Sequence, residues 1–294
     1  MWLPKFREQQ LIASYLDKKV EALDRAIGAK EQQITLLKER KHILIQNAVT
    51  RGLILDAPMR DSGIDWVGQI PAHWEQVRLK NVSNFITSGP RGWSEYFSEH
   101  GAYFLQSGNL NESMGIELGS AVKVNPPKGT EGLRTRLLDG DVLVCVTGAK
   151  TGKVALAKIS DYQEVYVNQH LCLVRPTKSI LPEFLALVLH SVVGQTYFFL
   201  QQYGLKQGLG LDDVNEALIL LPPHDEQQAI VDYVNTEVIK QNKAALLLEK
   251  QITKLKEYKA TLINSAVTGK IKVPGVMEPD EDVASQGAQE VPAL

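Results

Sequence analysis

Cysteine is scarce in this sequence, and long apolar runs are missing. Two cysteines among 294 residues, Cys145 and Cys172, are too few for a disulfide scaffold or for a four-ligand zinc site. Residues 1–10 are charged where a secretion signal needs an apolar core, and the longest apolar stretch, residues 180–200, is interrupted by proline, glutamate and histidine. We therefore expect a cytoplasmic protein with free thiols, no membrane partner and no metal.

The sequence also has no strong excess of positive or negative charge. The chain has 32 Lys+Arg and 34 Asp+Glu, whereas phosphate binding usually leaves a basic footprint. The formal charge of −2 therefore argues against a nucleic-acid partner. The total hides an uneven distribution, however, with +4 over residues 3–52, −3 over 53–220, +1 over 221–271 and −4 over 272–294. The last segment is acidic and poor in large apolar residues, which predicts a disordered tail.

The most informative feature is an internal repeat. The motif LPxxxEQQ at residues 3–10 recurs at residues 221–228, an offset of 218 residues. The match continues without a gap, so that EQQITLLKERKHILIQNAVT at residues 31–50 is matched by EKQITKLKEYKATLINSAVT at residues 249–268. Two copies do not make a solenoid. They bracket a separate segment, residues 53–220.

Both copies have the period of a coiled-coil helix. Seam positions recur at alternating spacings of three and four residues, which keeps one side of each helix facing a partner. The apolar seam residues are Val20, Leu23, Ile27, Ile34, Leu37 and Leu44 in the first copy, and Val238, Ala245, Leu248, Ile252, Leu255 and Leu262 in the second. Polar Lys41 and Lys259 occupy matching positions.

The length of these helices predicts a stalk. A helix from about Glu8 to Val49 would be roughly 63 Å long at about 1.5 Å per residue, too long to pack inside one small domain. With one domain between them, the two helices can leave and return side by side as an antiparallel coiled coil. The alternative, two surface helices of a single globule, leaves their repeated sequence unexplained.

The central segment predicts a mixed α/β domain. Short apolar runs bounded by Gly, Pro, Asn and Asp are typical of strands. The expected strands are residues 76–79, 102–106, 141–146, 154–158, 164–167 and 170–175, followed by a helix over 182–202. The expected fold class is therefore α+β, with one mixed domain over 53–220, long helices within 1–52 and 221–271, and a tail over 272–294.

Motifs for catalysis are incomplete. Residues 148–154 (GAKTGKV) resemble a phosphate loop, but three residues instead of four separate the glycines and valine follows the lysine. Residues 125–128 (NPPK) resemble the Asn-Pro-Pro-aromatic tetrad of amino-methyltransferases, but Lys128 replaces the aromatic residue that would stack on a flipped base. The six histidines show no metal-ligand spacing. We expect no enzyme activity, no cofactor and no metal.

Polar loops with interleaved cations and aromatics offer the groups that bind DNA. Arginine pairs with guanine, side-chain amides pair with adenine, and lysines contact phosphates. The candidate DNA-binding residues are Ser88, Gly89, Arg91, Trp93, Tyr96, Gln106, Ser107, Asn109, Lys150, Thr151, Lys153, Lys206 and Gln207. By composition alone, such loops are more often plain solvated turns.

The sequence resembles the specificity subunit of type I restriction-modification systems. The resemblance covers residues 3 to about 271. It rests on the duplicated helices, which end in NAVTRG at 47–52 and SAVTGK at 265–270, and on segments 70–75 (IPAHWE), 88–93, 104–110, 140–143, 168–170 and 221–223. Each piece alone is weak, but the combination is specific.

The resemblance implies a non-catalytic reader of double-stranded DNA. Such subunits resemble two target-recognition domains held apart by an antiparallel coiled coil. Methyltransferase subunits dock on the helices, and an ATP-driven restriction subunit joins for cleavage. Each domain reads one half of a split target, and the helices act as a ruler between the halves.

This sequence departs from that pattern because it opens with a conserved helix and lacks a first recognition domain. Two copies would restore a two-ended reader as a homodimer, and would then predict an interrupted palindromic target. Three alternatives stay open: pairing with a different half subunit, a decoy that binds methyltransferase but reads nothing, and a self-contained methyltransferase built around residues 125–127. The bases read do not follow from the sequence.

Overall fold

The computed structural model describes residues 4–159, 164–202 and 207–276. The chain divides into two compact units, one formed by residues 1–40 with 239–294 and the other by residues 41–238. Two long helices, α1 (Phe6–Arg51) and α6 (His224–Val267), contribute to both units. Each unit is described by itself below.

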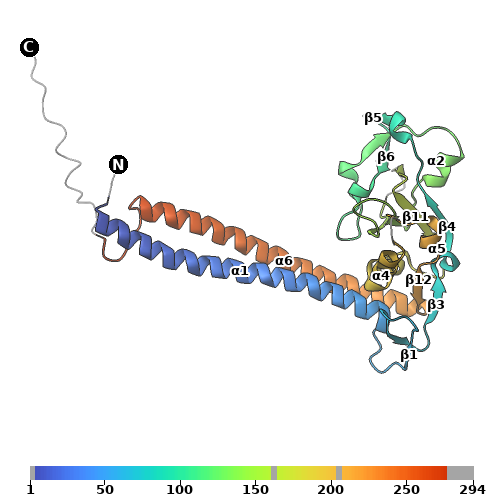
Figure 1. Ribbon diagram of the computed structural model, residues 1–294, viewed down its shortest axis with the longest axis horizontal. Coiled ribbons are helices and arrows are strands. Elements are labelled where there is room, and N and C mark those ends of the chain that lie inside the picture. Colours follow the sequence, from blue (N-terminus) through green and yellow to red (C-terminus); the bar gives the residue numbers. More distant parts are fainter. Residues whose placement is uncertain (1–3, 160–163, 203–206, 277–294) are drawn as a thin grey trace, which may run out of the picture. The chain divides into compact units, whose positions relative to one another are not determined.

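The first unit is a pair of helices that run in opposite directions. Neither α1 nor α6 contains proline, and good helix formers dominate both, so both continue unbroken for more than forty residues. They lie side by side (Figure 1). Three cross-helix contacts show the direction: Asp24 lies 2.6 Å from Lys259, whereas the later residues Lys30 and Glu31 contact the earlier residues Gln251, at 2.6 Å, and Lys256, at 3.4 Å.

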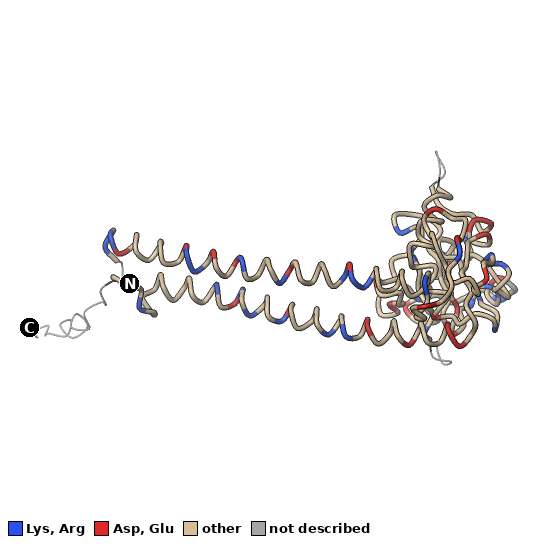
Figure 2. The backbone as a smooth tube through the Cα atoms, turned by 90° about the horizontal axis from the view of Figure 1, so that it is seen from below, with Lys and Arg blue, Asp and Glu red and all other residues tan. Residues whose placement is uncertain are grey.

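The burial pattern of this unit follows the seven-residue repeat. Ile27 and Ile252, both seam positions, are buried, and the other apolar seam residues of the unit are half-buried or buried. Basic and acidic residues are interspersed along both helices (Figure 2). Ile12, Ala266 and Val273 form a small core at the far end. Val273 lies inside the segment expected to be a tail, while residues 277–294 of that tail lie outside the described residues.

The second unit contains two four-stranded sheets. The first sheet is antiparallel, in the order β4 (Ser83–Ser88), β11 (Leu171–Pro176), β8 (Val142–Cys145) and β9 (Val154–Leu156). The second has the order β10 (Val165–Val167), β6 (Ala102–Leu105), β7 (Val122–Val124) and β5 (Phe97–Ser98), and only its β10–β6 pair is parallel. The unit also contains two separate two-stranded sheets. In these, β1 (Met59–Asp61) pairs with β2 (Gln69–Pro71), and β12 (Leu218–Leu221) pairs with β3 (Glu75–Arg78).

The helices of this unit differ from the expected pattern at one place. The single helix predicted over 182–202 is wrong, because the chain forms α3 (Pro182–His190) and α4 (Val192–Leu200), bent by 57°. Ser191 causes the break, since its hydroxyl accepts the Val193 N–H at 3.2 Å and caps α4. The short helices α2 (Thr130–Thr135) and α5 (Leu211–Asn215) complete the set.

No single helix in the described part of the chain is long and apolar enough to cross a membrane, and only the bent α3–α4 pair meets that criterion together. Six consecutive residues of α3, Phe184 to Leu189, are buried in the unit. Their apolar character is therefore explained by core packing.

The main core includes the ends of the long helices. Ile45 and Val49 of α1 and Ile230 and Val234 of α6 pack in one cluster with Trp74. A second cluster between the two sheets contains Leu105, Leu143, Val167 and Leu173. The compact unit consequently extends beyond the expected limits of 53 and 220, to residues 41–238.

Candidate nucleic-acid interface

Strand direction brings four loops to one edge of the second unit. Strands β6 and β10 are parallel, so their carboxyl ends lie together. Strands β4 and β8 are both antiparallel to β11, so their carboxyl ends lie beside the start of β11, where Cys145 pairs with Leu171 and Ser88 with Cys172. A short turn joins β10 to β11. We call the loops at these ends, residues 88–91, 106–109, 146–151 and 168–170, the loop edge.

Hydrogen bonds join these loops directly. The Gly89 N–H donates to the Leu171 carbonyl at 3.3 Å, and the Asn168 N–H donates to the Leu105 carbonyl at 3.0 Å. Lys150 Nζ lies 3.3 Å from the Gly108 carbonyl oxygen. A fifth segment joins the edge because the Leu209 N–H donates to the Val146 carbonyl at 2.7 Å. The loops therefore form one continuous surface.

Gly89 is the closest packing point of this surface. A Cβ atom at this position would lie 2.0 Å from the Val167 carbonyl oxygen and 2.4 Å from Asn168 C. No side chain fits at such distances, so the two loops meet only because residue 89 is glycine.

The loop edge carries the polar groups that DNA recognition uses. Arg91 and Lys150 are exposed cations, and Gln106 and Gln207 supply side-chain amides. Ser88 and Ser107 add half-buried hydroxyls, and Thr151 donates its own hydroxyl hydrogen to the Gly148 carbonyl at 2.6 Å. Tyr96, with about two-fifths of its surface exposed, lies on the turn that follows the first loop. Lys206 lies outside the described residues.

Two predicted DNA contacts do not fit the structure and are withdrawn. Trp93 is only 3% exposed and stacks on Phe104, with ring centroids 5.6 Å apart, so it is a core residue. Asn109 is 6% exposed, and its carboxamide accepts the Gln106 N–H at 2.8 Å and donates to Ser120 Oγ at 3.1 Å. Because its amide is used to shape the turn, Asn109 has no base-reading group left on the surface.

Lys153 also has a role different from the expected one. Its side chain is 14% exposed and pairs with Glu112, which occupies its ammonium group. The hydrogen bond to Lys153, followed by the attraction of its charge, lowers the pKa of the Glu112 carboxyl. Lys153 thus faces a pocket rather than the exposed surface of the loop edge.

The structure adds residues that the sequence did not indicate as site residues. Thr147 Oγ1 is hydrogen-bonded to His170 Nδ1, and Gln169 Nε2 lies 3.2 Å from His170 Nε2. Arg134 of α2 holds the first loop by donating to Thr87 Oγ1 and, at 3.1 Å, to the Ser88 carbonyl. Parallel pairing of β6 with β10, sixty residues apart, brings residues 168–170 to the edge, and no local sequence pattern predicts that pairing.

A buried ion pair fixes the sheet behind the loop edge. Arg175 donates to both carboxylate oxygens of Asp141, from Nε and Nη2, at 2.8 Å each. Asp141 is 1% exposed, and the hydrogen bond from Arg175 to it raises the pKa of the arginine. The pair joins β11 to the start of β8, because Asp141 immediately precedes that strand.

Comparisons with known proteins agree with this arrangement. A family model described as the type I restriction modification DNA specificity domain matches residues 71–260. The chain belongs to the family of type I restriction-modification specificity subunits.

Individual relatives give the extent of the similarity. The chain is 25% identical over 280 residues to the putative type I restriction enzyme MjaX specificity subunit of Methanocaldococcus jannaschii, covering 92% of this chain and 59% of that protein. It is 25% identical over 241 residues to the type I restriction enzyme EcoBI specificity subunit of Escherichia coli, covering 78% and 49%. The chain thus spans about half to three-fifths of the length of these curated relatives.

Solved structures show the same fold. A chain from a study of complex assembly and conformational transition of the type I R-M system matches with a TM-score of 0.70 at 20% identity, covering 92% of this chain and 61% of that one. The HsdS subunit from Thermoanaerobacter tengcongensis matches with a TM-score of 0.56 at 18% identity, covering 92% and 60%.

Proposed function

We propose that this chain reads a specific sequence in double-stranded DNA for a type I restriction-modification complex in the cytoplasm. The convergence of the loops after β4, β6, β8 and β10 carries the proposal, because it gathers cations and amides on one exposed surface. The chain performs no catalysis itself. It directs methyltransferase and restriction subunits to the target.

Arg91 supplies the test of this reading. An arginine that pairs with a guanine edge contributes about 1–3 kcal/mol of discrimination, which is roughly 5- to 150-fold in affinity. Arg91→Ala should therefore weaken binding to the target duplex much more than binding to a scrambled duplex, measured by fluorescence anisotropy in the presence of the methyltransferase subunit. Lys178→Ala, which removes an exposed cation away from the loop edge, is the control and should change neither.

An equal loss on both duplexes would make Arg91 a phosphate contact. The overall charge of residues 53–220 is −3, so affinity comes from local cations and from partner subunits. Binding by the isolated chain should consequently be weak and should fall with added salt.

The long helices provide the docking surface for the methyltransferase subunit in this proposal. They form an antiparallel coiled coil whose outer faces carry large apolar side chains: Leu36, Leu246, Leu247 and Tyr258 are each more than half exposed. Helices of a partner can cover such side chains while the interspersed charges set the register. The restriction subunit joins through the assembled complex.

A split target follows if two recognition domains act together. In the second repeat copy, Glu226 accepts the Trp74 indole N–H at 2.9 Å and Gln227 accepts the Leu181 N–H at 2.8 Å, so both anchor the recognition domain. Within the described residues, their equivalents in the first copy, Glu8 and Gln9, form only local side-chain hydrogen bonds, with Lys5 and Pro4. A second copy of the chain would supply a second domain, and a homodimer would read an interrupted palindrome.

Solution mass distinguishes the assembly states. Light scattering of the chain alone and with the methyltransferase subunit should give a dimer of this chain in at least one of the two samples. A single copy in both samples would contradict the homodimer and favour pairing with a different half subunit.

A second candidate is an interaction protein that binds methyltransferase but reads no DNA. The apolar outer faces of α1 and α6 favour it, because they support docking whatever the loop edge does. Such a decoy would bind every duplex equally, so the comparison of target with scrambled DNA separates the two candidates.

A further inference from the structure

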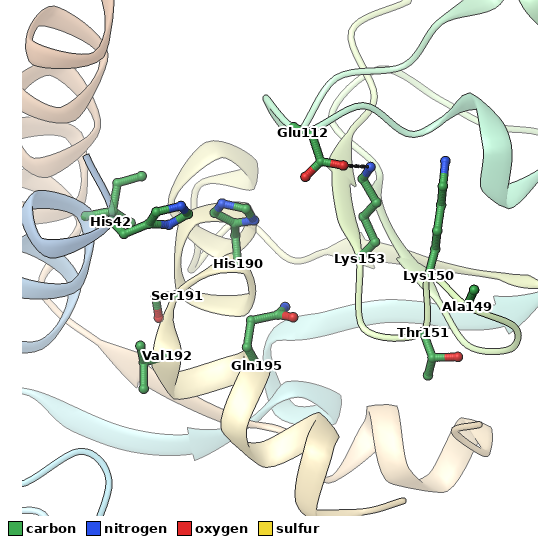
Figure 3. Close-up of a pocket in the computed structure, with 11 residues that line it drawn as sticks. His42, Glu112, Ala149, Lys150, Thr151, Lys153, His190, Ser191, Val192 and Gln195 are labelled. Atoms are coloured by element: carbon green, nitrogen blue, oxygen red, sulfur yellow. Dashed lines mark hydrogen bonds and ion pairs between the residues drawn. The ribbon is translucent and has the colours of Figure 1, made fainter. Parts of the chain in front are cut away.

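A pocket of about 550 Å³ lies within residues 41–238 and borders the loop edge, with which it shares Ala149, Lys150 and Thr151. Side chains from four segments line it: the end of α1, the loop after β6, the β8–β9 hairpin and the α3–α4 junction (Figure 3). The polar groups that matter are His42, Glu112, Lys150, Lys153, His190 and Gln195.

Positive groups outnumber negative ones around this pocket. Lys150 and Lys153 come from the hairpin, and Lys41 of α1 is close enough for its charge to act on His190. Glu112 is the single acidic residue among those that line the pocket. Its side chain is 93% exposed, so it pairs with Lys153 from the solvent side and is free to swing away.

The two histidines are the unused donors of the pocket. Their rings stack with centroids 6.1 Å apart at an angle of 28°. In the described part of the chain neither ring forms a hydrogen bond, whereas the neighbouring Gln195 amide donates to the Gly152 and Leu189 carbonyls at 2.8 Å each. Burial, followed by the charges of His42 and Lys41, lowers the pKa of His190. The two imidazoles have ring nitrogens free to donate to a ligand, and the three nearby lysines make the surroundings favourable for an anion.

We propose that this pocket binds a phosphate group, held by Lys150, Lys153 and the His42–His190 pair, and that Glu112 is a built-in counter-ion which the ligand displaces from Lys153. The volume is in the range of small-molecule sites and accommodates a nucleotide. Recognition uses side chains, not the backbone cradle of a phosphate loop. The phosphate belongs either to a free nucleotide or to the DNA backbone.

Phosphate binding in this pocket should depend on pH. A bound phosphate stabilises the protonated imidazoles, so binding takes up protons and becomes tighter as the pH falls. The charged groups that face the imidazoles are Lys41, Lys150, Lys153 and Glu112. Glu112 stays ionised at pH 6 because its pKa is lowered, so the histidines carry the protein's part of the pH dependence. The terminal phosphate of the ligand also takes up a proton near pH 6, and this contribution is the same for the wild-type chain and for His190→Gln.

The test is calorimetric titration of the full chain with pyrophosphate and with ATP, at constant ionic strength and at pH 7.5 and 6.0. Affinity should be about five- to tenfold higher at pH 6.0, within the limit of tenfold per pH unit for uptake of one proton. His190→Gln should remove most of this difference.

Removal of the negative charge of Glu112 should strengthen phosphate binding. Glu112→Gln should tighten pyrophosphate binding about three- to tenfold, because the competing carboxylate is lost. Glu117→Gln, which removes an exposed acid from the same loop without touching the pocket, is the matched control and should leave affinity unchanged. Since Glu112 is exposed, its replacement does not threaten folding.

Failure of both pyrophosphate and ATP to bind the wild-type chain and Glu112→Gln at millimolar concentration would overturn the proposal. Equal effects of Glu112→Gln and Glu117→Gln would overturn it too, since binding would then follow overall charge. Competition between ATP and a random duplex would support the pocket with DNA as the phosphate source. Simultaneous binding would support it with a free nucleotide as the source.

Discussion

At the scale of residues, the candidate interface depends on a few positions that hold its loops together. Gly89 lets two loops touch, Asn109 shapes a third, and Arg134 ties the first loop to α2. Gly89 and Asn109 were predicted to contact DNA because they lie in polar loops. In a sequence, an amide that reads a base cannot be distinguished from an amide that shapes a loop; the burial of the side chain distinguishes them in the structure. Arg91 is exposed and Gln106 is half-buried, so contact with DNA stays a prediction for both.

Gly89→Ala should separate the first loop from residues 167–168 and reduce target affinity about tenfold or more. The added Cβ would lie 2.0 Å from a backbone carbonyl oxygen, which cannot yield as a flexible side chain does. Binding of the target duplex measures the effect. Gly108→Ala is the matched control on the same edge, because no heavy atom lies within 4 Å of its Cβ position. Wild-type affinity in Gly89→Ala would contradict the loop packing.

Asp141→Ala should destabilise the domain by about 3 kcal/mol, because it leaves the Arg175 guanidinium without its partner. Chemical denaturation followed by circular dichroism measures the free energy of unfolding. Glu216→Ala, which breaks solvent-exposed pairs with Lys80 and Arg78, should cost clearly less. Similar losses in both variants would show that burial of the Asp141 pair adds nothing.

At the scale of elements, the long helices and six of the twelve strands in the described residues could be predicted from the sequence. The predicted seam residues, such as Ile27, are buried or half-buried in the structure, because each helix packs against its partner along one side. The six expected strands are all present. Strands β1, β2, β5 and β7 were missed because two or three residues carry no period, and β4 because SNFITS does not alternate cleanly between apolar and polar residues. Strand β12 was missed because its apolar run ends in the leucine of the repeated Leu-Pro. The break between α3 and α4 was not predicted because it depends on a single residue, Ser191, which caps α4.

The α3–α4 junction should make the stability of the domain pH-dependent. Burial keeps the pKa of His190 below the value of about 6.5 that it has in the unfolded chain, so the unfolded state binds more protons between these two values. The free energy of unfolding should therefore fall as the pH is lowered through 6.5, and His190→Gln should flatten this fall. Urea denaturation between pH 8 and 5 in phosphate-free buffer tests it. An unchanged slope in the variant would contradict the account.

At the scale of the whole molecule, a formal charge of −2 is compatible with the proposed DNA binding because it averages unlike parts. The first helix region carries +4 and the last segment −4, and in the proposal recognition depends on a few cations at one edge of a domain with a charge of −3. The order of repeat, domain and repeat could be predicted because the two helices have similar sequences over about fifty residues. The grouping of the loops could not be predicted, because it results from parallel pairing between strands that are distant in the sequence.

The central claim is that the loop edge selects a DNA sequence for methylation. Methylation mapping of host DNA, with the chain present, deleted, and replaced by Gly89→Ala, tests it most directly. We predict that one interrupted motif is methylated only when the chain is present, that it is lost or weakened with Gly89→Ala, and that Gly108→Ala preserves it. An identical set of methylated motifs with and without the chain would contradict the account.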